Sequence, residues 1–283
     1  MGKMYHYDGA SWEPVKLITY EGGLISGAID LSDVFGFATN DVFAVGQRIF
    51  DNPTPPPNFL DSSLIIHYDG NNWTEVPIVP GRELVGVWGS SNLDVWAGGV
   101  EASLYHLEAR SWRKYPQTDT SWFSQFGGFS STDVYALSYA WDSDLRDNTY
   151  HYLWHWDGHS WSLDDYFPER YDLPVKFGTS SISVIDGSLY TVGIGLFRRS
   201  GTGWENIYTG PQGTYFEEMS GPSNRNVFAV GNNGVVCHYN GSNWYQFPEF
   251  VSPTVSYYGV WFDGKEVFVV GNDGHRTYVL HGK

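Results

Sequence analysis

The chain has 283 residues and a formal net charge of −16, with 16 Lys and Arg against 32 Asp and Glu. Because affinity for a phosphate backbone comes from clustered Lys and Arg, this balance argues against nucleic acid as a partner. No run of about eighteen apolar residues occurs, so we expect no membrane insertion. The single cysteine, Cys237, excludes an internal disulfide and is expected to be a small buried apolar residue.

One unit of about forty residues recurs along the chain. Its most regular part is the hexapeptide Asp-Val-Phe-Ala-Val-Gly, and the six copies close at Gly46, Gly99, Ser138, Gly193, Gly231 and Gly271. Periods of this size are typical of propellers and solenoids. The units are expected at about 33–78, 84–116, 125–166, 176–208, 216–247 and 257–283.

Each unit is predicted to form four antiparallel strands, counted from inner to outer. Short alternating runs of apolar and aromatic residues, such as Leu64–Tyr68, are strand patterns. The pair Asp69-Gly70 and its repeats supply the positive φ angles of tight hairpins. The first strand is glycine-rich because strands that converge on an axis leave little room for side chains. The hexapeptide forms the second strand, a His-Tyr pair ends the third, and a tryptophan opens the fourth.

The tryptophan that opens the fourth strand recurs as Trp73, Trp112, Trp161, Trp204 and Trp244. At the usual spacing of 13 residues from the closing glycine, the last unit would need its copy near residue 284, whereas a further copy, Trp12, precedes the first unit. We therefore expect Ala10–Val15 to supply the outer strand of the last blade and to close the ring without an exposed edge.

Two segments, Met4–Tyr7 and Tyr278–His281, resemble a third strand, and we expect the C-terminal one to pair in the last blade. The sequence thus predicts an all-β, six-bladed β-propeller of four-stranded antiparallel blades, closed by the N-terminal strand. Because no linker interrupts the repeats, residues 1–283 are expected to form a single domain.

The repeat resembles bacterial propeller repeats with the consensus Trp-Gly-Ser…Asp-Val-Phe-Ala-Val-Gly…His-Tyr-Asp-Gly-x-x-Trp, which are loosely related to the Asp-box repeats of sialidase-like propellers. The turn Asp69–Trp73 departs from the Asp box, since it lacks the leading Ser and its Asp-to-Trp spacing is one residue shorter. In Asp-box families this hairpin is structural, so the resemblance implies a fold rather than a reaction. The Arg-Ile-Pro motif of sialidases is absent.

Proteins with such repeats look mostly like bacterial envelope or secreted proteins. The resemblance therefore favours a secreted or envelope location with the signal peptide outside this chain, and a cytoplasmic location is the alternative. The N-terminal residues themselves lack the apolar core of a signal peptide.

Function is expected where the units differ, because shared residues are needed to build every blade. Two insertions lie between second and third strands, at Gln47–Ser62 and Tyr139–Tyr150. The first contains four prolines and is predicted to be an extended, stiff loop. Both emerge on the face that also carries the loops between blades, which we call the insertion face.

Aromatic and acidic residues gather in the loops of the insertion face. The candidate ligand-binding residues are Tyr139, Trp141, Asp142, Asp144, Trp122, Tyr166, Tyr171, Tyr215 and Tyr257. Flat rings beside carboxylates suit the apolar face and hydroxyl rim of a sugar, and they equally suit a peptide anchored by side chains. The competing interpretation is that these rings pack between blades and cover the core.

The leading hypothesis is a non-catalytic, lectin-like module that binds carbohydrate. A glycan-active hydrolase or lyase is the alternative, and no spacing selects a catalytic pair among Asp119, Asp164, Asp165, Asp172, Glu217 and Glu218. A protein-binding or structural scaffold comes third. The oligomeric state is left open.

No cofactor or metal site is predicted. The histidines His67, His106, His155 and His238 share one repeat position, so they are expected to be structural. The acidic loop 142–147 lacks the glycine turn and distal Glu of a standard calcium loop, and a solvated acidic loop is favoured over a calcium site.

Overall fold

The computed structural model describes residues 4–19, 22–23, 25, 28–51, 59–77, 81–116, 121–142, 148–170, 173–211 and 213–283. Strands dominate these residues, and the helical elements within them are two 3-10 turns, η1 (Asn232–Gly234) and η2 (Pro248–Phe250). No helix in the described part of the chain is long and apolar enough to cross a membrane. The predicted all-β class is confirmed.

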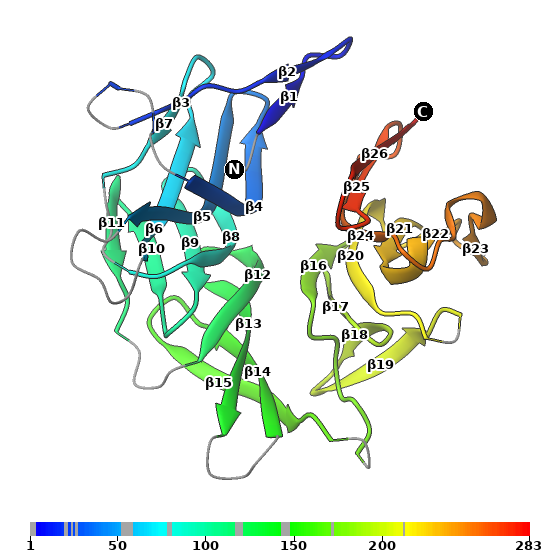
Figure 1. The fold of residues 1–283 in the computed structure, drawn as a ribbon. Coiled ribbons are helices and arrows are strands. Elements are labelled where there is room, and N and C mark those ends of the chain that lie inside the picture. Colours follow the sequence, from blue (N-terminus) through cyan, green and yellow to red (C-terminus); the bar gives the residue numbers. More distant parts are fainter. Residues whose placement is uncertain are drawn as a thin grey trace. The chain divides into compact units, whose positions relative to one another are not determined.

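Six antiparallel sheets follow one another along the chain and make the protein a six-bladed β-propeller (Figure 1). We number the blades 1 to 6 in chain order. In blades 2 to 5 the four strands pair in sequence order.

Each of the first three blades has a first, second, third and fourth strand. Blade 1 contains β4 (Ala28–Ala38), β5 (Asp41–Asp51), β6 (Phe59–Tyr68) and β7 (Trp73–Glu75). Blade 2 contains β8 (Leu84–Ser91), β9 (Asp94–Gly99), β10 (Leu104–Glu108) and β11 (Ser111–Lys114). Blade 3 contains β12 (Trp122–Ser130), β13 (Asp133–Asp142), β14 (Asn148–Trp156) and β15 (Trp161–Pro168).

The remaining blades continue the pattern. Blade 4 contains β16 (Ser181–Ile185), β17 (Ser188–Val192), β18 (Leu196–Ser200) and β19 (Gly203–Tyr208). Blade 5 contains β20 (Phe216–Ser223), β21 (Asn226–Gly231), β22 (Val236–Tyr239) and β23 (Trp244–Gln246). Blade 6 contains β24 (Ser256–Phe262), β25 (Val267–Asn272) and β26 (Thr277–Gly282).

The chain divides into two compact units. Unit 1 comprises Met1–Phe126 and Ser138–Trp141, and unit 2 comprises Gly127–Leu137 and Asp142–Lys283. The expectation that residues 1–283 form a single domain stays a prediction.

A His-Asp pair explains two of the most regular positions of the repeat. In blade 2, Nε2 of His106 lies 2.6 Å from Oδ1 of Asp94, and the imidazole stacks on Trp96 with ring centroids 3.8 Å apart. The equivalent hydrogen bonds are Asp41–His67, Asp133–His155 and Asn226–His238, at 2.7, 2.8 and 2.7 Å. Each histidine therefore joins the second strand to the third within its own blade, as expected of a structural residue.

The His-Tyr-Asp-Gly-x-x-Trp motif builds the hairpin between third and fourth strands. In blade 1, Oδ1 of Asp69 accepts hydrogen bonds from the backbone N–H groups of Asn71 and Asn72, both at 2.9 Å. Gly70 takes a φ of 92°, which an L residue rarely adopts. The rings of Tyr68 and Trp73 stack at 5.2 Å across the hairpin. The motif thus serves the turn rather than a ligand.

The glycine that closes the second strand is required by close packing of backbones. A Cβ on Gly99 would overlap the carbonyl oxygen of Glu83, and one on Gly231 would overlap the carbonyl oxygen of Tyr215. In each case the obstructing backbone is the entry into the first strand of the same blade. Glycine at this position lets the two innermost strands approach each other.

In three blades the fourth-strand tryptophan packs into the hydrophobic cluster that its blade shares with the preceding blade. Trp112 packs against the cluster of blades 1 and 2, which contains Phe43. Trp204 does so between blades 3 and 4, and Trp244 between blades 4 and 5. The interblade cores therefore depend on the outer strands.

The expected closure of blade 6 by the N-terminal strand stays a prediction, since β2 (Trp12–Pro14) belongs to unit 1 and blade 6 to unit 2. Blade 6 has three described strands, and β2 pairs with β1 (Tyr5–Tyr7) in a separate two-stranded sheet. Residues 6–12 carry the full turn motif, and Asp8 accepts from the N–H groups of Ala10 and Ser11 at 2.8 Å. Because this hairpin closes locally, it has a low entropic cost and gives β2 a partner at once.

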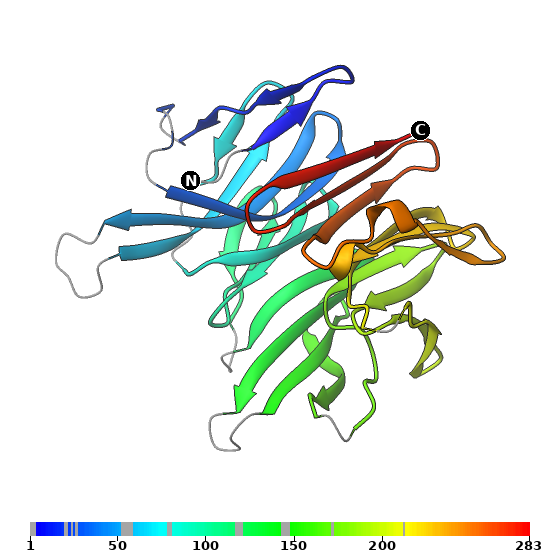
Figure 2. The same cartoon turned by 45° about the vertical axis from the view of Figure 1, so that its right-hand side comes forward.

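The N-terminal segment also adds to blade 1. Strand β3 (Leu17–Ile18) lies parallel to β7 and makes this blade five-stranded. The two ends of the first insertion form strands rather than parts of a stiff loop. Strands β5 and β6 stay paired as far as Asp51 and Phe59. This long hairpin extends from blade 1 in Figure 2. Its prolines at 53 and 55–57 lie outside the described residues.

Candidate functional site

Of the nine predicted ligand-binding residues, five have described side chains. Trp141 and Asp142 belong to β13, but their side chains lie outside the described part of the structure, as do Asp144 and Tyr171 altogether. The acidic loop 142–147 and its calcium alternative fall mostly in the same gap. The other five residues occupy four different places.

Trp122 and Tyr139 come together in unit 1. Their ring centroids lie 5.4 Å apart, and both side chains are half-buried. Burial raises the pKa of the Tyr139 hydroxyl, and the nearby carboxylate of Glu83 adds to this effect. The hydroxyl of Ser32 donates to Glu83 at 3.2 Å. Of this pair, Tyr139 belongs to the second insertion and Trp122 opens β12.

Tyr257 belongs to the core instead. It is 4% exposed and packs in the cluster of blades 5 and 6. The competing interpretation, that rings from the interblade loops cover the core, applies to this residue. It is therefore left out of the candidate site.

Tyr215 lies in a polar cluster at the start of the inner strands of blades 4 and 5. Its hydroxyl shares a hydrogen bond of 3.1 Å with Thr179, and its backbone N–H donates to Oδ1 of Asn232. Next to it, Ser180 donates to the carboxylate of Glu217 at 2.8 Å. Burial raises the pKa of Glu217, against the opposing effect of the Ser180 hydrogen bond. A half-buried carboxyl with a raised pKa is a feature of functional sites.

Tyr166 contacts Lys176, which lines an open groove in unit 2 that the sequence did not reveal. The groove measures about 400 Å³, and we call it the Trp204 groove; its lining residues are Asp165, Val175, Lys176, Phe197, Gly203, Trp204 and Asn206. Nζ of Lys176 lies 3.1 Å from Oδ1 of Asp165 and 5.6 Å from the ring centroid of Tyr166. Tyr166 itself is 49% exposed.

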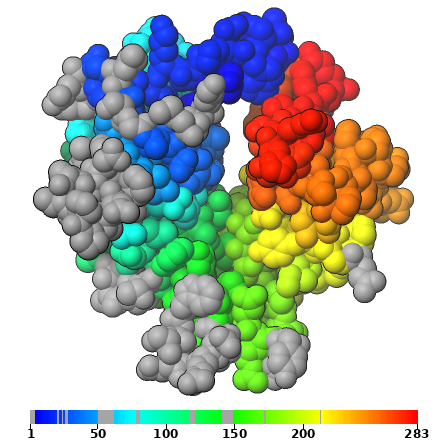
Figure 3. Space-filling view, in the orientation of Figure 1, coloured from blue at the N-terminus to red at the C-terminus, as the bar shows by residue number. Residues whose placement is uncertain are grey.

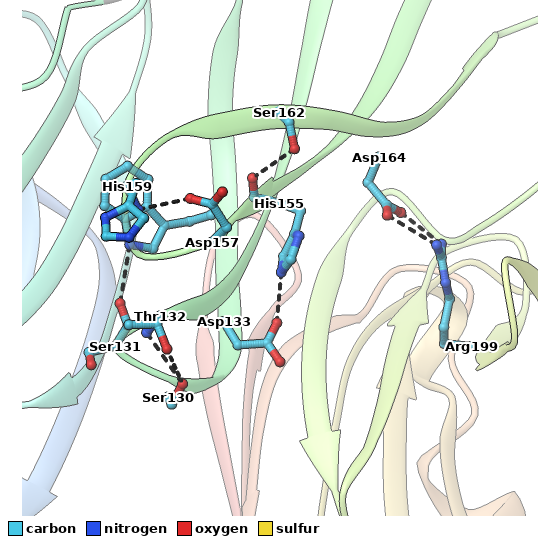
Figure 4. A network of polar contacts seen from close by, with 11 residues as sticks. Ser130, Ser131, Thr132, Asp133, His155, Asp157, His159, Ser162, Asp164 and Arg199 are labelled. Carbon is cyan, nitrogen blue, oxygen red and sulfur yellow. Dashed lines mark hydrogen bonds and ion pairs between the residues drawn. The ribbon is translucent and has the colours of Figure 1, made fainter.

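Trp204 gives this groove an unsatisfied donor. Its indole N–H is buried and has no hydrogen-bond acceptor among the residues that the structure describes. The guanidinium of Arg199 lies 5.1 Å from the centroid of the Trp204 ring. This guanidinium is itself paired with the carboxylate of Asp164 at 2.8 Å. Figure 4 shows this Arg199–Asp164 pair beside the Asp133–His155 hydrogen bond of blade 3.

The Trp204 groove combines the groups that a polyhydroxylated ligand needs. Asp165 supplies acceptors, Lys176 and the indole N–H supply donors, and Asn206 supplies both. Phe197 and the Trp204 ring supply apolar surface. Lys176 could have been singled out from the sequence, because Lys and Arg total 16 and this one sits in an aromatic-rich interblade segment. Trp204 could not, because the repeat assigns it to the core.

The described residues were compared with the requirements of a metal site and of a reactive thiol. Among them, no group of three or more His, Cys, Asp and Glu side chains could hold a metal ion. Burial raises the pKa of the Cys237 thiol to about 11, so this cysteine is no thiolate nucleophile near neutral pH.

Comparison with known proteins shows the fold alone. No family model and no curated protein matches the chain. YCF48 from Cyanidioschyzon merolae is similar in structure, with a TM-score of 0.58 and 16% identity over 96% of this chain and 85% of that one. The computationally designed Ika8 protein gives a TM-score of 0.59 at 10% identity, over 99% of this chain and 91% of its own. Both agree with the propeller architecture.

Proposed function

We propose that this propeller is a non-catalytic recognition module that binds carbohydrate in the Trp204 groove. One observation carries the proposal: Trp204 lines a groove together with the Asp165–Lys176 pair, and its buried indole N–H has no acceptor among the described residues. A buried donor without a partner costs about 1–3 kcal/mol. A ligand hydroxyl that reaches this N–H after a shift of the covering side chains would accept from it and recover that energy on binding.

The charged pair supports a neutral, hydroxyl-rich ligand. Asp165 and Lys176 lie together at 3.1 Å, so the groove presents acceptors and a donor side by side with little net charge. Sugar hydroxyls both donate and accept, and the apolar face of a pyranose packs on aromatic rings. Phe197 and Trp204 line the groove and supply such rings.

The test is a glycan array followed by calorimetry on the hits. Trp204→Phe keeps an aromatic ring in the cluster but removes the N–H, and we expect it to weaken binding about tenfold. Trp244→Phe is the matched control, because Trp244 occupies the same repeat position in blade 5 away from the groove. Silence across all glycans, or equal effects of the two variants, would contradict the proposal.

A glycan-active enzyme is the second candidate, and Glu217 is the observation that favours it. Its raised pKa suits a general acid, whereas Asp164 and Asp165 are each paired with a cation. Release of sugar or of an unsaturated product, abolished by Glu217→Gln, would support this alternative and exclude the non-catalytic module.

A further inference from the structure

Three tyrosine rings lie next to one another on the outer strands of blade 3. Tyr152 of β14 is opposite Tyr166 of β15, and their ring centroids lie 6.4 Å apart with the ring planes 24° from parallel. Tyr150 lies two residues before Tyr152, with centroids 6.3 Å apart. We call these three residues the tyrosine row. In Figure 3 the green atoms of the β14–β15 hairpin are visible at the lower edge of the view, beside the yellow-green atoms of the segment that follows.

A bulge in β15 places the tyrosine row and the Trp204 groove on the two sides of one strand. The register of β15 against β14 shifts at Asp164, which is the extra residue. Bulges redirect the side chains of the strand that contains them. Accordingly, the adjacent residues Asp164 and Asp165 both reach toward blade 4, where they pair with Arg199 and Lys176. Tyr166 comes next and joins the row on the other face.

Lys176 connects the groove with the tyrosine row. It lines the Trp204 groove, and its Nζ lies 5.6 Å from the ring centroid of Tyr166. The same nitrogen lies 3.1 Å from Oδ1 of Asp165, and the Lys176 side chain is 52% exposed. An ammonium group has three donors, so it can serve a ligand hydroxyl as well as this carboxylate. A ligand that extends beyond the groove past Lys176 therefore meets Tyr166 next.

Tyr166 offers accessible aromatic surface to such a ligand. It is 49% exposed even though it packs beside Tyr152, and Leu163 on the same strand is 46% exposed. An aromatic ring that is half open to water suits the apolar face of a pyranose, while donors and acceptors beside it suit the sugar hydroxyls. The Trp204 groove, at about 400 Å³, is at the small end of ligand pockets. A longer ligand must continue outside it.

We propose that the Trp204 groove and the tyrosine row form one extended site, whose ligand is an oligosaccharide of at least two sugar units. This inference rests on the proposed function and specifies the ligand class of the same site. One unit occupies the groove beside Trp204. The next unit packs on Tyr166, and Lys176 donates to hydroxyls where the two units meet.

The test compares monosaccharides with disaccharides by calorimetry on the full chain. The probes are glucose, galactose and mannose, together with the α-linked and β-linked disaccharides of each. We expect a disaccharide of the preferred sugar to bind about fivefold or more tightly than its monosaccharide, because the second unit gains contact with an aromatic ring.

Two tyrosine variants locate the second unit. Tyr166→Ala should remove the advantage of the disaccharide over the monosaccharide, because the second unit then has no ring to pack on. Tyr245→Ala is the matched control. Tyr245 is also an exposed tyrosine on a fourth strand, at 55% exposure on β23 of blade 5, and it does not line the groove. The control should keep the full advantage of the disaccharide.

The extended site and the proposed function fail in different ways. Monosaccharide binding that Trp204→Phe weakens, without any gain from a second unit, would overturn the extended site alone. A gain that survives Tyr166→Ala, or one that Tyr245→Ala also removes, would do the same. Silence across all these saccharides would overturn the extended site and the carbohydrate proposal together, and would leave the tyrosine row to a partner of another kind.

Discussion

Oδ1 of Asp94 lies 2.6 Å from Nε2 of His106, whose side chain is only 6% exposed. The bond joins the first residue of β9 to the third strand of blade 2, and the imidazole covers Trp96. Blade 5 makes the same bond with Asn226 in place of the aspartate, at 2.7 Å. A neutral acceptor is therefore sufficient for the geometry.

This comparison predicts different costs for two substitutions of Asp94. Asp94→Ala leaves a buried imidazole nitrogen without its acceptor and should lower the free energy of unfolding by about 1–3 kcal/mol. Asp94→Asn copies blade 5 and should cost less than about 1 kcal/mol. Urea denaturation measures both. Equal losses in the two variants would show that the charge, rather than the hydrogen bond, matters.

The repeat made the blade predictable down to side-chain roles. Strand order, the turn at Asp69 and the structural histidines all follow from positions that recur, because each blade must solve the same packing problem. The partner of His67 was not predicted, although the Asp that opens the second strand recurs as regularly as the histidine. Its role needed the register that pairs Phe43 with His67.

The candidate site was harder to predict than the blades, because it depends on residues that differ from one repeat to the next. Tyr257 and Tyr215 stand at similar places before or within a first strand, yet the former is buried and the latter joins a polar cluster. The sequence pattern carries no information on which neighbour each ring meets. The local pairing of Trp12 with Tyr7 was not predicted either, although residues 6–12 carry the complete turn motif.

The glycine that closes the second strand should not tolerate a methyl group. Gly231→Ala would place a Cβ against the carbonyl of Tyr215 and 2.9 Å from Cα of Phe216, and backbone atoms cannot move aside as a flexible side chain can. We expect a loss of about 2 kcal/mol or more in stability. Gly203→Ala is the control, because its nearest neighbour would be 3.9 Å away. Thermal denaturation of the two variants should separate them clearly.

Asp33 should make stability depend on pH. Burial raises its pKa to about 7, although it accepts hydrogen bonds from the N–H groups of Val34 and Val87. The folded state then binds more protons than the unfolded state between about pH 4 and 7, so stability falls as the pH rises through this window. One pKa unit is worth about 1.4 kcal/mol, which limits the fall to about 4 kcal/mol.

Asp33→Asn isolates this contribution. The variant loses one acceptor and starts from a lower stability at pH 4, but its free energy of unfolding should lack the decline that Asp33 causes up to pH 7. Denaturant titrations of both proteins at several pH values give the comparison. Parallel pH profiles would show that the carboxyl ionises as freely in the folded chain as in the unfolded one.

Two adjacent arginines should differ in their importance. Arg199 forms a two-point pair with Asp164, at 2.8 and 3.1 Å, with both side chains 19% exposed, and it lies over the ring of Trp204. Arg199→Met leaves the Asp164 carboxylate largely buried without its cation and should cost about 2–4 kcal/mol. Arg198 pairs with Glu205 at 2.7 Å on the surface, where the side chains are 43% and 53% exposed. Arg198→Met should therefore cost less than about 1 kcal/mol. Chemical denaturation of the two variants side by side tests the difference, and a similar cost for both would mean that the Asp164 pair is solvated well enough to be replaced by water.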